Sequence, residues 1–571
     1  MSTVPVTTAA QQRLPTEVQP ENPFTALPVV QSNVTSAPQS FGQDMPLSDD
    51  SLSRPPPDVF KFATESSLHV KPIAAPLERS LSTAERWGIT LDRVVKGIVS
   101  IRFTILRTFE RSFPGQASAT GFVVDRTRGI ILSNRHVVNP GPITATALFN
   151  KYEEIPIEPL YADPVHDFGF FKFDPADLKF AALEEIELYP EGAKVGLDIK
   201  VCGNDGGEQR SVLSGTLSRL DRGCPHSSDF NTFYIQAASG TSAGSSGSPV
   251  LDLQGRAVAL NAAGATNSAS DFYLPLDKVQ RALKLLQQGK PISRGTLQTE
   301  FRHLSYEYLR KLGLPEAIEK ESRQRHVDGT GLLTVSGVVP EGPGYLAGLQ
   351  VGDILLKLEH PVYGERYVNN FYSVWDVLDE IVDQRITMTV CRGTELLTIE
   401  ARVQDLHSII PNEFFEVGAG IIHPVSYQVA KHNNMPCRGL VVVQGGTLWQ
   451  VNTPFILTQF DGREVSTISE FIEIVRAIPD KKKVMFKYRA FGSWQENLIL
   501  TEMEHHFFGM TYFKRTGMAW DRQLVRLAAT ENLSDFPKTF DVERELTWSE
   551  ELRRNLVLVH CRVPFSIRVC L

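Results

Sequence analysis

The chain has 571 residues, of which 42% are hydrophobic and 22% charged, and its formal net charge is −8. This length exceeds a single core and predicts about three to four domains in a soluble, globular protein. The mild negative charge and the lack of a dense Lys/Arg block argue against nucleic acid as a partner.

Six cysteines are scattered through the sequence without CxxC pairs or metal-ligand spacing, and no apolar leader follows the first residue. We therefore expect a reduced compartment, no secretion, no metal and no cofactor. No apolar run reaches the roughly 18 residues that cross a bilayer, so a membrane is not an expected partner.

The first 85 residues are rich in Pro, Ser, Thr and Gln and contain few large apolar residues. Such a segment cannot bury enough apolar surface to offset the entropy of ordering. The sequence therefore predicts a disordered N-terminal arm over residues 1–85.

From residue 86 to about residue 290, short β-branched runs alternate with Gly, Pro, Asn and Asp at intervals of about 8 to 12 residues. This spacing is typical of an all-β barrel or sandwich. The run KVQRALKLLQQGK then has helical periodicity and ends at Gly289. A β-rich domain closed by one helix is therefore predicted.

Two blocks of roughly 100 residues follow, at 295–405 and 406–505. Each has a Gly-led apolar strand, GLLTVSGVV or GLVVVQG, and a later amphipathic helix, SVWDVLDEIV or ISEFIEIVRAI. The repeated order of strand and helix indicates two similar α+β domains.

The segment Gly240 to Val250 reads GTSAGSSGSPV and lies between two strand-like runs, which argues against a flexible linker. Gly244 precedes Ser246 by two residues and Gly247 follows it, so the backbone can make a tight turn. Acyl transfer to serine needs such an exposed hydroxyl and nearby N–H donors. Ser246 is therefore the candidate nucleophile.

A base and an acid to orient it occur upstream. His136 ends the apolar run IILSNRHVV, where a side chain can be rigid and still reach a cleft; the alternative is a histidine satisfied beside the core. Asp167 opens an apolar strand and needs a buried partner, whereas Asp163 and Asp174 precede prolines and indicate turns. Neighbouring His166 should face the other way. His136 and Asp167 are the predicted base and orienting acid.

The order His136, Asp167, Ser246 is that of chymotrypsin-like double barrels, and the sequence around these residues resembles the HtrA serine proteases. It resembles in particular the nuclear, pro-apoptotic HtrA-like proteases of fungi. The resemblance is carried by ATGFVVD, GIILSNRHVV, DPVHDFGFFKFDP, DFNTFYIQAA, GSSGSPV and KPISRGTLQ, and further along by GLL, EGPGY and VGDILLKL.

The resemblance implies a mainly β fold, with a chymotrypsin-like double β-barrel at 86–290 followed by two PDZ-like α+β domains. It places the catalytic triad on His136, Asp167 and Ser246, the residues already chosen. It also implies an oxyanion hole formed by the backbone N–H groups of Gly244 and Ser246.

The resemblance also implies that the PDZ domains bind peptides by strand addition. In the first block, the backbone N–H groups near Gly331, Leu332 and Leu333 are expected to bind a peptide's terminal carboxylate. The second block keeps the strand but has a less recognisable carboxylate loop, so it either binds peptides or only packs against the protease domain.

We therefore expect a serine endopeptidase that acts on protein and peptide substrates, with PDZ domains that recognise peptide C-termini or regulate the protease. The small residues from Ala259 to Gly264 predict a primary pocket for apolar side chains. The alternative on the same fold is a catalytically silent scaffold or chaperone. The resemblance implies a nuclear protein, and otherwise a cytoplasmic one, that can form a homo-oligomer.

Residues 506–571 are expected to form a linker and the truncated start of a second protease-like half. Their last segment, RRNLVLVHCRVPFSIRVCL, resembles DRVVKGIVSIRFTILR near the start of the protease-like domain. An isolated apolar strand would be an aggregation hazard, so a shortened isoform or gene model is expected.

Overall fold

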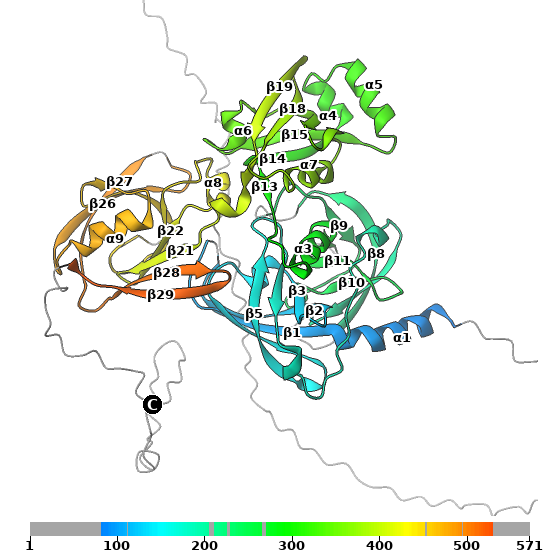
Figure 1. Cartoon of the computed structure of the whole chain (residues 1–571), viewed down its shortest axis with the longest axis horizontal. Helices are drawn as coiled ribbons and strands as arrows, with labels where there is room; N and C mark the ends of the chain where they lie inside the picture. Colours follow the sequence, from blue (N-terminus) through cyan, green and yellow to red (C-terminus); the bar gives the residue numbers. More distant parts are fainter. Residues whose placement is uncertain are drawn as a thin grey trace, which may run out of the picture. The chain divides into compact units, whose positions relative to one another are not determined.

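The computed structural model describes residues 81–110, 112–204, 211–224, 229–264, 270–451, 454–493 and 495–528 (Figure 1). Of the two units into which the chain divides, Met1–Arg79 and Ser80–Leu571, every described residue belongs to the second. Nearly all of the expected N-terminal arm therefore lies outside the described residues.

Helix α1 (Thr83–Val94) begins before the boundary expected at residue 85. Ser82 caps it, because its hydroxyl accepts the Glu85 N–H while the Glu85 carboxylate accepts the Ser82 N–H. This capping box satisfies N–H groups that the first helical turn would otherwise leave without partners. The expected boundary of the arm is thus a few residues too late.

Two closed, antiparallel six-stranded barrels follow and confirm the predicted double barrel. In the first, the order is β1 (Ile98–Ile105), β2 (Gly115–Asp125), β3 (Ile130–Ser133), β6 (Gly169–Lys172), β5 (Glu154–Ala162) and β4 (Ile143–Leu148). In the second, the order is β10 (Pro249–Leu251), β11 (Ala257–Gly264), β12 (Asp271–Pro275), β9 (Tyr234–Ala237), β8 (Ser211–Arg222) and β7 (Asp198–Gly203). The short helix α2 (Arg135–Val138) follows β3.

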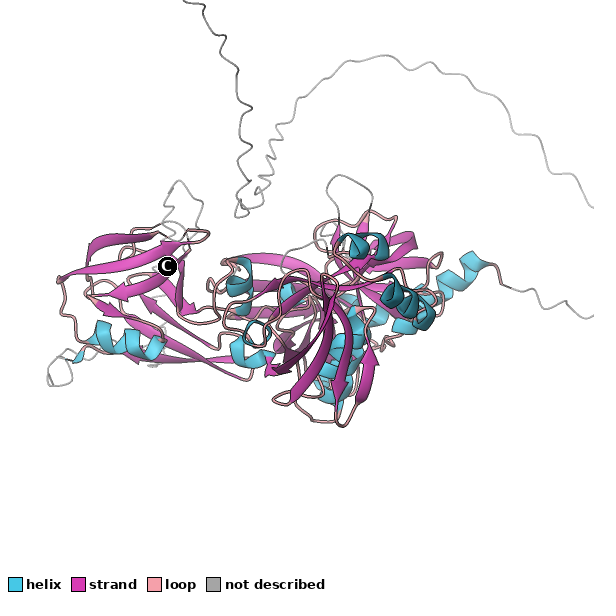
Figure 2. Ribbon diagram, turned by 90° about the horizontal axis from the view of Figure 1, so that it is seen from above, coloured by secondary structure: helices cyan, strands magenta, loops and turns pink. Residues whose placement is uncertain are grey.

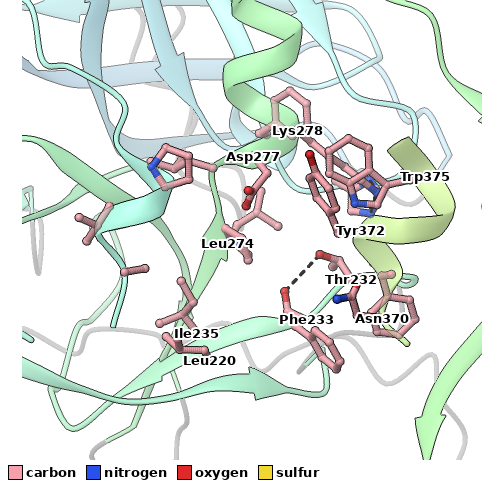
Figure 3. Close-up of a pocket in the computed structure, with 18 residues that line it drawn as sticks. Leu220, Thr232, Phe233, Ile235, Leu274, Asp277, Lys278, Asn370, Tyr372 and Trp375 are labelled. Atoms are coloured by element: carbon pink, nitrogen blue, oxygen red, sulfur yellow. Dashed lines mark hydrogen bonds between the residues drawn. The ribbon is translucent and has the colours of Figure 1, made fainter. Parts of the chain in front are cut away.

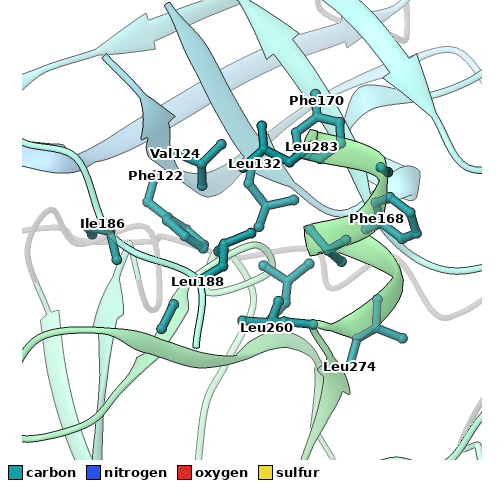
Figure 4. Close-up of a cluster of buried hydrophobic side chains, with 14 of the residues drawn as sticks. Phe122, Val124, Leu132, Phe168, Phe170, Ile186, Leu188, Leu260, Leu274 and Leu283 are labelled. Carbon is teal, nitrogen blue, oxygen red and sulfur yellow. The ribbon is translucent and has the colours of Figure 1, made fainter. Parts of the chain in front are cut away.

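A shared hydrophobic core joins the two barrels (Figure 4). Phe122 and Leu132 of the first barrel pack in the same cluster as Leu260 of the second. Helix α3 (Asp277–Gln287) covers this cluster, and it buries Val279, Ala282 and Leu283 at helical spacing. Burial of a side chain such as Val279 or Leu283 contributes about 1.5–3 kcal/mol, so this cluster holds the two barrels against each other.

The first PDZ-like block contains an antiparallel sheet and a small two-stranded ribbon. The sheet order is β14 (Thr299–Ser305), β15 (Gly331–Val338), β16 (Ile354–His360), β18 (Arg385–Arg392) and β19 (Glu395–Arg402), with β17 (Gly364–Tyr367) beside β16. The ribbon pairs β13 (Gly295–Thr296) with β20 (Gln404–Asp405), and the helices are α4 (Tyr306–Lys311), α5 (Glu316–Arg325), α6 (Pro343–Leu346) and α7 (Phe371–Leu378). The predicted strand and helix therefore correspond to β15 and α7.

The second PDZ-like block contains a larger antiparallel sheet. Its order is β27 (Glu496–Glu502), β26 (Lys483–Ala490), β24 (Phe455–Phe460), β23 (Leu440–Gln444), β22 (Gly420–Pro424), β21 (Glu413–Val417), β28 (Met510–Thr516) and β29 (Ala519–Val525), with β25 (Arg463–Glu464) beside β24. The helices are α8 (Tyr427–His432) and α9 (Ile468–Arg476). The predicted strand and helix correspond to β23 and α9.

The expected domain boundary at residue 505 is wrong. Strand β28 pairs with β21, with Phe415 opposite Tyr512, and β29 extends the same sheet. Residues 510–525 are therefore part of the second PDZ-like sheet and not of a linker. The expected truncated protease strand lies at residues 553–571, outside the described residues.

Strands dominate the described part of the chain (Figure 2). Within those residues, no helix combines the length and the hydropathy that a bilayer crossing requires.

Candidate active site

His136 and Asp167 meet at one end of the first barrel. His136 lies in α2 just after β3, and Asp167 lies in the loop just before β6, which is the neighbour of β3 in the sheet. The imidazole Nδ1 lies 3.0 and 2.9 Å from the two carboxylate oxygens of Asp167, and the His136 backbone N–H donates to Oδ1. Because a carboxylate only accepts, Nδ1 carries the proton and Nε2 keeps a free lone pair.

Two opposing effects act on the pKa of His136. Burial of the ring, the largest effect, lowers this pKa, but the charge of Asp167 and its hydrogen bond together outweigh burial and raise the pKa overall. The pKa of Asp167 is lowered, because the charge of His136 and its hydrogen bonds outweigh burial. The His136 side chain is nevertheless 49% exposed, so its free nitrogen is accessible to a substrate.

The turn that carries Ser246 is built on two glycines. Gly244 and Gly247 have φ values of +99° and +84°, a region that other residues rarely adopt. A Cβ atom on Gly247 would lie 2.1 Å from the carbonyl oxygen of Thr120 and 2.4 Å from the hydroxyl of Ser133. The turn therefore packs directly against β2 and β3. Its contact on β3, Ser133, lies three residues before His136 in the sequence.

Two residues that the sequence did not single out fix this turn. The Thr120 backbone N–H donates to the Ser246 carbonyl at 2.8 Å, and the Thr120 hydroxyl donates to the Gly244 carbonyl at 2.9 Å. Asn261 of β11 donates its side-chain N–H to the Ser245 carbonyl at 2.9 Å, and its own carbonyl accepts the Gly247 N–H. A polar residue in the buried run AVALNAAG is the one sequence signal that could have identified Asn261.

These bonds leave the proposed oxyanion donors available. Among the described residues, neither the Gly244 nor the Ser246 N–H donates to another protein group, whereas Ser245, Gly247 and Ser248 all do. The Ser246 hydroxyl likewise forms no hydrogen bond with His136 in the described part of the chain. The structure thus joins His136 to Asp167 but not to Ser246, and such bonds often tighten only when substrate is bound.

A second carboxylate, that of Asp229, holds the backbone of Asp167 in place. Asp229 accepts the Asp167 backbone N–H at 3.2 Å and the Tyr234 hydroxyl at 2.8 Å. Burial raises the pKa of Asp229, and the nearby charge of Asp167 adds to this effect. Asp229 belongs to the segment before β9, so the second barrel contributes to the position of the predicted orienting acid.

His166 lies in a buried ionic cluster and not beside Ser246. Arg294 forms an ion pair with Asp163, and its Nη2 donates to His166 Nδ1 at 3.0 Å. Neutral His166 must then carry its proton on Nε2, which lies 2.9 Å from the Lys278 amine. Burial lowers the pKa of Lys278 to about 7, consistent with an amine that accepts this bond. Asp163 is thus an ion-pair partner as well as the predicted turn residue.

The same cluster reaches the first PDZ-like sheet. Arg294 Nε lies 3.3 Å from the Asp379 carboxylate at the end of α7, and the Lys278 amine lies 5.1 Å from the centre of the Trp375 ring. A cavity of about 260 Å³ lies between α7 and the second barrel, with Phe233, Tyr372 and Trp375 in its wall (Figure 3).

The expected carboxylate site at Gly331, Leu332 and Leu333 is not supported. These residues lie in β15, where Gly331 to Leu333 pair with β14 and Leu333 also pairs with β16. The Leu332 and Leu333 side chains are buried, and a Cβ on Gly331 would lie 1.8 Å from the Leu304 carbonyl oxygen. Because β15 is an inner strand, it has no free edge for an added peptide.

Strand β14 is one of the two edges of this sheet, and the protease domain contacts it. The Asn231 side chain accepts the Phe301 N–H at 2.7 Å and donates to the Thr299 carbonyl at 2.9 Å. Phe233 packs between His303 of β14 and Phe371 of α7, with ring centres 5.5 and 4.9 Å apart. A segment just before β9 thus makes strand-like bonds along β14.

The described residues hold no cluster of three or more His, Cys, Asp or Glu that could bind a metal ion. The groups at the barrel interface are instead a hydroxyl, an imidazole, a carboxylate and two backbone N–H donors. These are the parts that acyl transfer to a serine requires.

Comparisons with known proteins define the class. Residues 119–260 match the trypsin-like peptidase domain, and residues 408–481 match the PDZ-like domain. The first match contains His136, Asp167 and Ser246, and the second covers the strands from β21 to β25 of the second PDZ-like sheet. The chain thus combines a trypsin-like peptidase fold with a PDZ-like domain.

Two relatives show a more specific likeness. The chain is 44% identical over 455 residues to Protease Do-like 7 of Arabidopsis thaliana, a match that covers 76% of this chain and 41% of the relative. It is 42% identical over 520 residues to the pro-apoptotic serine protease NMA111 of Vanderwaltozyma polyspora, which covers 87% of this chain and 52% of the relative. The chain is similar to these serine proteases along most of its own length, and it spans about half the length of the curated relatives it matches.

Among solved structures, the HtrA-type protease AlgW with a tripeptide matches 56% of this chain and 96% of its own chain. The two are 19% identical, and the TM-score is 0.43.

Proposed function

We propose that this chain is a serine endopeptidase that hydrolyses peptide bonds in proteins. The observation that carries the proposal is the His136–Asp167 pair, with a free Nε2 nitrogen at the barrel edge where the Ser246 turn packs against β2 and β3. In this reaction His136 takes the Ser246 proton as the hydroxyl attacks the carbonyl carbon. It then gives the proton to the leaving amine, and water repeats the sequence on the acyl-enzyme.

The backbone supports this reaction through charge stabilisation. The Gly244 and Ser246 N–H groups have no protein acceptor among the described residues, so they can donate to the developing oxyanion. Loss of one such donor generally reduces turnover by about 10²- to 10³-fold. Thr120 and Asn261 hold the turn from the two barrels, which keeps these donors in place.

The test is covalent labelling of the full chain with a fluorophosphonate probe. We expect the wild type to be labelled and the Ser246→Ala variant to remain unlabelled, with peptide cleavage lost in parallel. Ser248→Ala is a matched control, because Ser248 lies in the same turn but its hydroxyl is fully buried. An unlabelled but folded wild type would favour the silent scaffold instead.

Peptide recognition by the first PDZ-like sheet is assigned to β14 in this proposal. It is an edge strand, and a groove of about 860 Å³ runs beside it between the sheet and the protease domain. Added peptides pair with such edges through backbone hydrogen bonds. The Asn231 side chain already bonds to the Phe301 N–H and the Thr299 carbonyl of β14. These bonds support the proposal that the backbone groups of β14 are available to an added strand.

We further propose a nuclear, pro-apoptotic role and self-association. Two relatives are named pro-apoptotic serine proteases, which supports the role. The resemblance of the sequence to the nuclear HtrA-like proteases of fungi supports the location. A fluorescent fusion viewed in living cells tests the location, and light scattering of the purified chain tests self-association. A cytoplasmic fusion or a monomer would reject the corresponding part.

A further inference from the structure

The loop between β1 and β2 is held by the second PDZ-like sheet. Arg107 forms an ion pair with Glu416, and the Thr108 hydroxyl donates to the Gln444 side chain at 2.7 Å. Phe109 is fully buried, and its ring lies within 6.1 Å, centre to centre, of three rings from that sheet: Phe414, His423 and Trp520. A buried aromatic anchor of this kind usually dominates the energy of a contact surface.

The sheet that holds this loop has no open edge at β22. Ile422 pairs with Phe415 of β21 on one side and with Val442 of β23 on the other. An added peptide strand therefore has no unpaired backbone to join there, in contrast to β14. Peptide binding at β22 therefore does not account for the contacts between this sheet and the loop that joins β1 to β2.

His423 of β22 connects the sheet to the loop backbone. Its Nδ1 donates to the Pro424 carbonyl at 2.7 Å, so its Nε2 accepts the Glu110 N–H at 3.1 Å. Glu110 has a φ of +51°, which is costly for a residue other than glycine. The bond from His423 therefore holds Glu110 in a conformation that it would rarely adopt alone.

The side chain of Glu110 then reaches the residue beside the proposed base. Its Oε2 lies 2.8 Å from Nη2 of Arg135, and both side chains are largely buried. Arg135 Nε donates to the Asp163 carbonyl at 2.7 Å, and Arg135 immediately precedes His136 in α2. The charge of Arg135 lowers the pKa of His136, so this contact bears on the electrostatics as well as the position of the imidazole.

We propose that His423 and Glu110 are positioning residues for His136, and that the second PDZ-like sheet serves through them as a fixed support for the catalytic helix α2. The inference rests on the proposed function, since it assumes that His136 is the general base. The contacts run without a gap from His423 to Glu110, from Glu110 to Arg135, and along the chain to His136.

The first test changes Glu110. Glu110→Ala removes the support of Arg135, and we expect kcat to fall about tenfold with KM nearly unchanged, because small misplacements of a catalytic group are costly. Glu110→Gln keeps the size and an acceptor but removes the charge. The uncompensated Arg135 should then lower the His136 pKa further, and the acid limb of the pH–kcat/KM profile should move to lower pH.

Arg107→Ala is the matched control, because it removes a contact of the same loop that does not lead to Arg135. We expect it to keep the wild-type kcat and pH profile. The groups that face Glu110 are Arg135, Arg515 and His423, and those that act on His136 are Asp167 and Arg135. The inference would be overturned if Glu110→Gln had the wild-type pH–kcat/KM profile and Glu110→Ala had the wild-type kcat.

The second test changes the acceptor on β22. His423→Leu leaves the Glu110 N–H without a partner and should slow fluorophosphonate labelling, whereas His423→Gln offers a carbonyl oxygen and should restore part of the rate. Equal labelling of both variants and the wild type would contradict the inference. A wild type that is not labelled at all would instead reject the proposed function, so the two failures are distinguishable.

Discussion

At the scale of single residues, Asp167 sets the protonation of His136. Its charge and hydrogen bond outweigh burial, so the His136 pKa lies above the ordinary value of 6.5. Because the base must be neutral to accept the Ser246 proton, activity should rise with pH through a midpoint above 6.5. The pH dependence of kcat/KM with a fluorogenic peptide measures this midpoint.

The Asp167→Asn variant tests whether the charge of Asp167 raises the pKa of His136. Loss of the charge should lower the His136 pKa and move the midpoint down. Because the amide can present its N–H to Nδ1 and favour the wrong tautomer, kcat should also fall by about 10⁴-fold, as in the chymotrypsin-type triad. Asp177→Asn is an exposed control in the same domain, and an unchanged midpoint in Asp167→Asn would contradict the assignment.

Gly247 permits a prediction that does not depend on charge. Gly247→Ala places a Cβ against the Thr120 carbonyl at a φ of +84°, so the turn has to move. We expect labelling of Ser246 to fall by more than about 10²-fold, because the oxyanion donors move with the turn. Gly240→Ala is a matched control in open space, and equal labelling of both variants would argue against this role of Gly247.

Local sequence patterns identified His136, Asp167 and Ser246 as candidates because each lies beside an apolar run or a glycine turn. Thr120 and Asp229 were missed because they act through contacts between barrels, and Asn261 because it acts across its own sheet; local spacing encodes neither kind of contact. His136 and Asp167 are 31 positions apart in the sequence, and the pairing of β3 with β6 brings them together. The catalytic roles themselves stay predictions until Ser246 is labelled.

At the scale of elements, the edge of β14 is occupied by Asn231. Asn231→Ala removes two hydrogen bonds that compete with an added strand, each worth about 0.5–1.5 kcal/mol. A peptide that binds the wild type should therefore bind this variant about tenfold more tightly. Fluorescence anisotropy with a labelled C-terminal peptide, found by array screening of the wild type, measures the change.

Thr232→Ala is the control for this change, since the Thr232 hydroxyl donates to the Phe233 carbonyl and not to β14. Its affinity should match that of the wild type. If Asn231→Ala binds the peptide equally or more weakly, β14 is not the peptide-binding edge.

The misplaced carboxylate site has a physical cause. GLLTVSGVV has the alternation and β-branched residues of a strand, and the structure has β15 there. Sequence pattern does not tell an inner strand from an edge strand, because both bury apolar side chains. The expected boundary at residue 505 has a similar cause. Strand β28 belongs to the sheet through its pairing with β21, which lies about 100 residues earlier, and local sequence does not encode such a pairing.

At the scale of the whole molecule, Arg294 joins the protease domain to the first PDZ-like sheet. Its guanidinium is 6% exposed and contacts the carboxylates of Asp163 and Asp379. Arg294→Met leaves both carboxylates buried without their partner, and we expect a loss of about 3–5 kcal/mol in the free energy of unfolding. Urea denaturation followed by tryptophan fluorescence measures it.

Arg385→Met removes a partner from an exposed ion pair with Glu400 and should leave the midpoint of denaturation nearly unchanged. Equal stability of Arg294→Met and Arg385→Met would show that the buried cluster does not hold the domains together.

The Arg294 cluster also bears on how the molecule opens. Because one guanidinium contacts carboxylates on both sides of the domain boundary, separating the two domains would break a buried ion pair. The amides of α7 and of β6 should therefore exchange with solvent deuterium at a single opening free energy. In thermodynamic terms, we expect the protease and first PDZ-like domains to behave as one cooperative unit, although each has its own sheet and core.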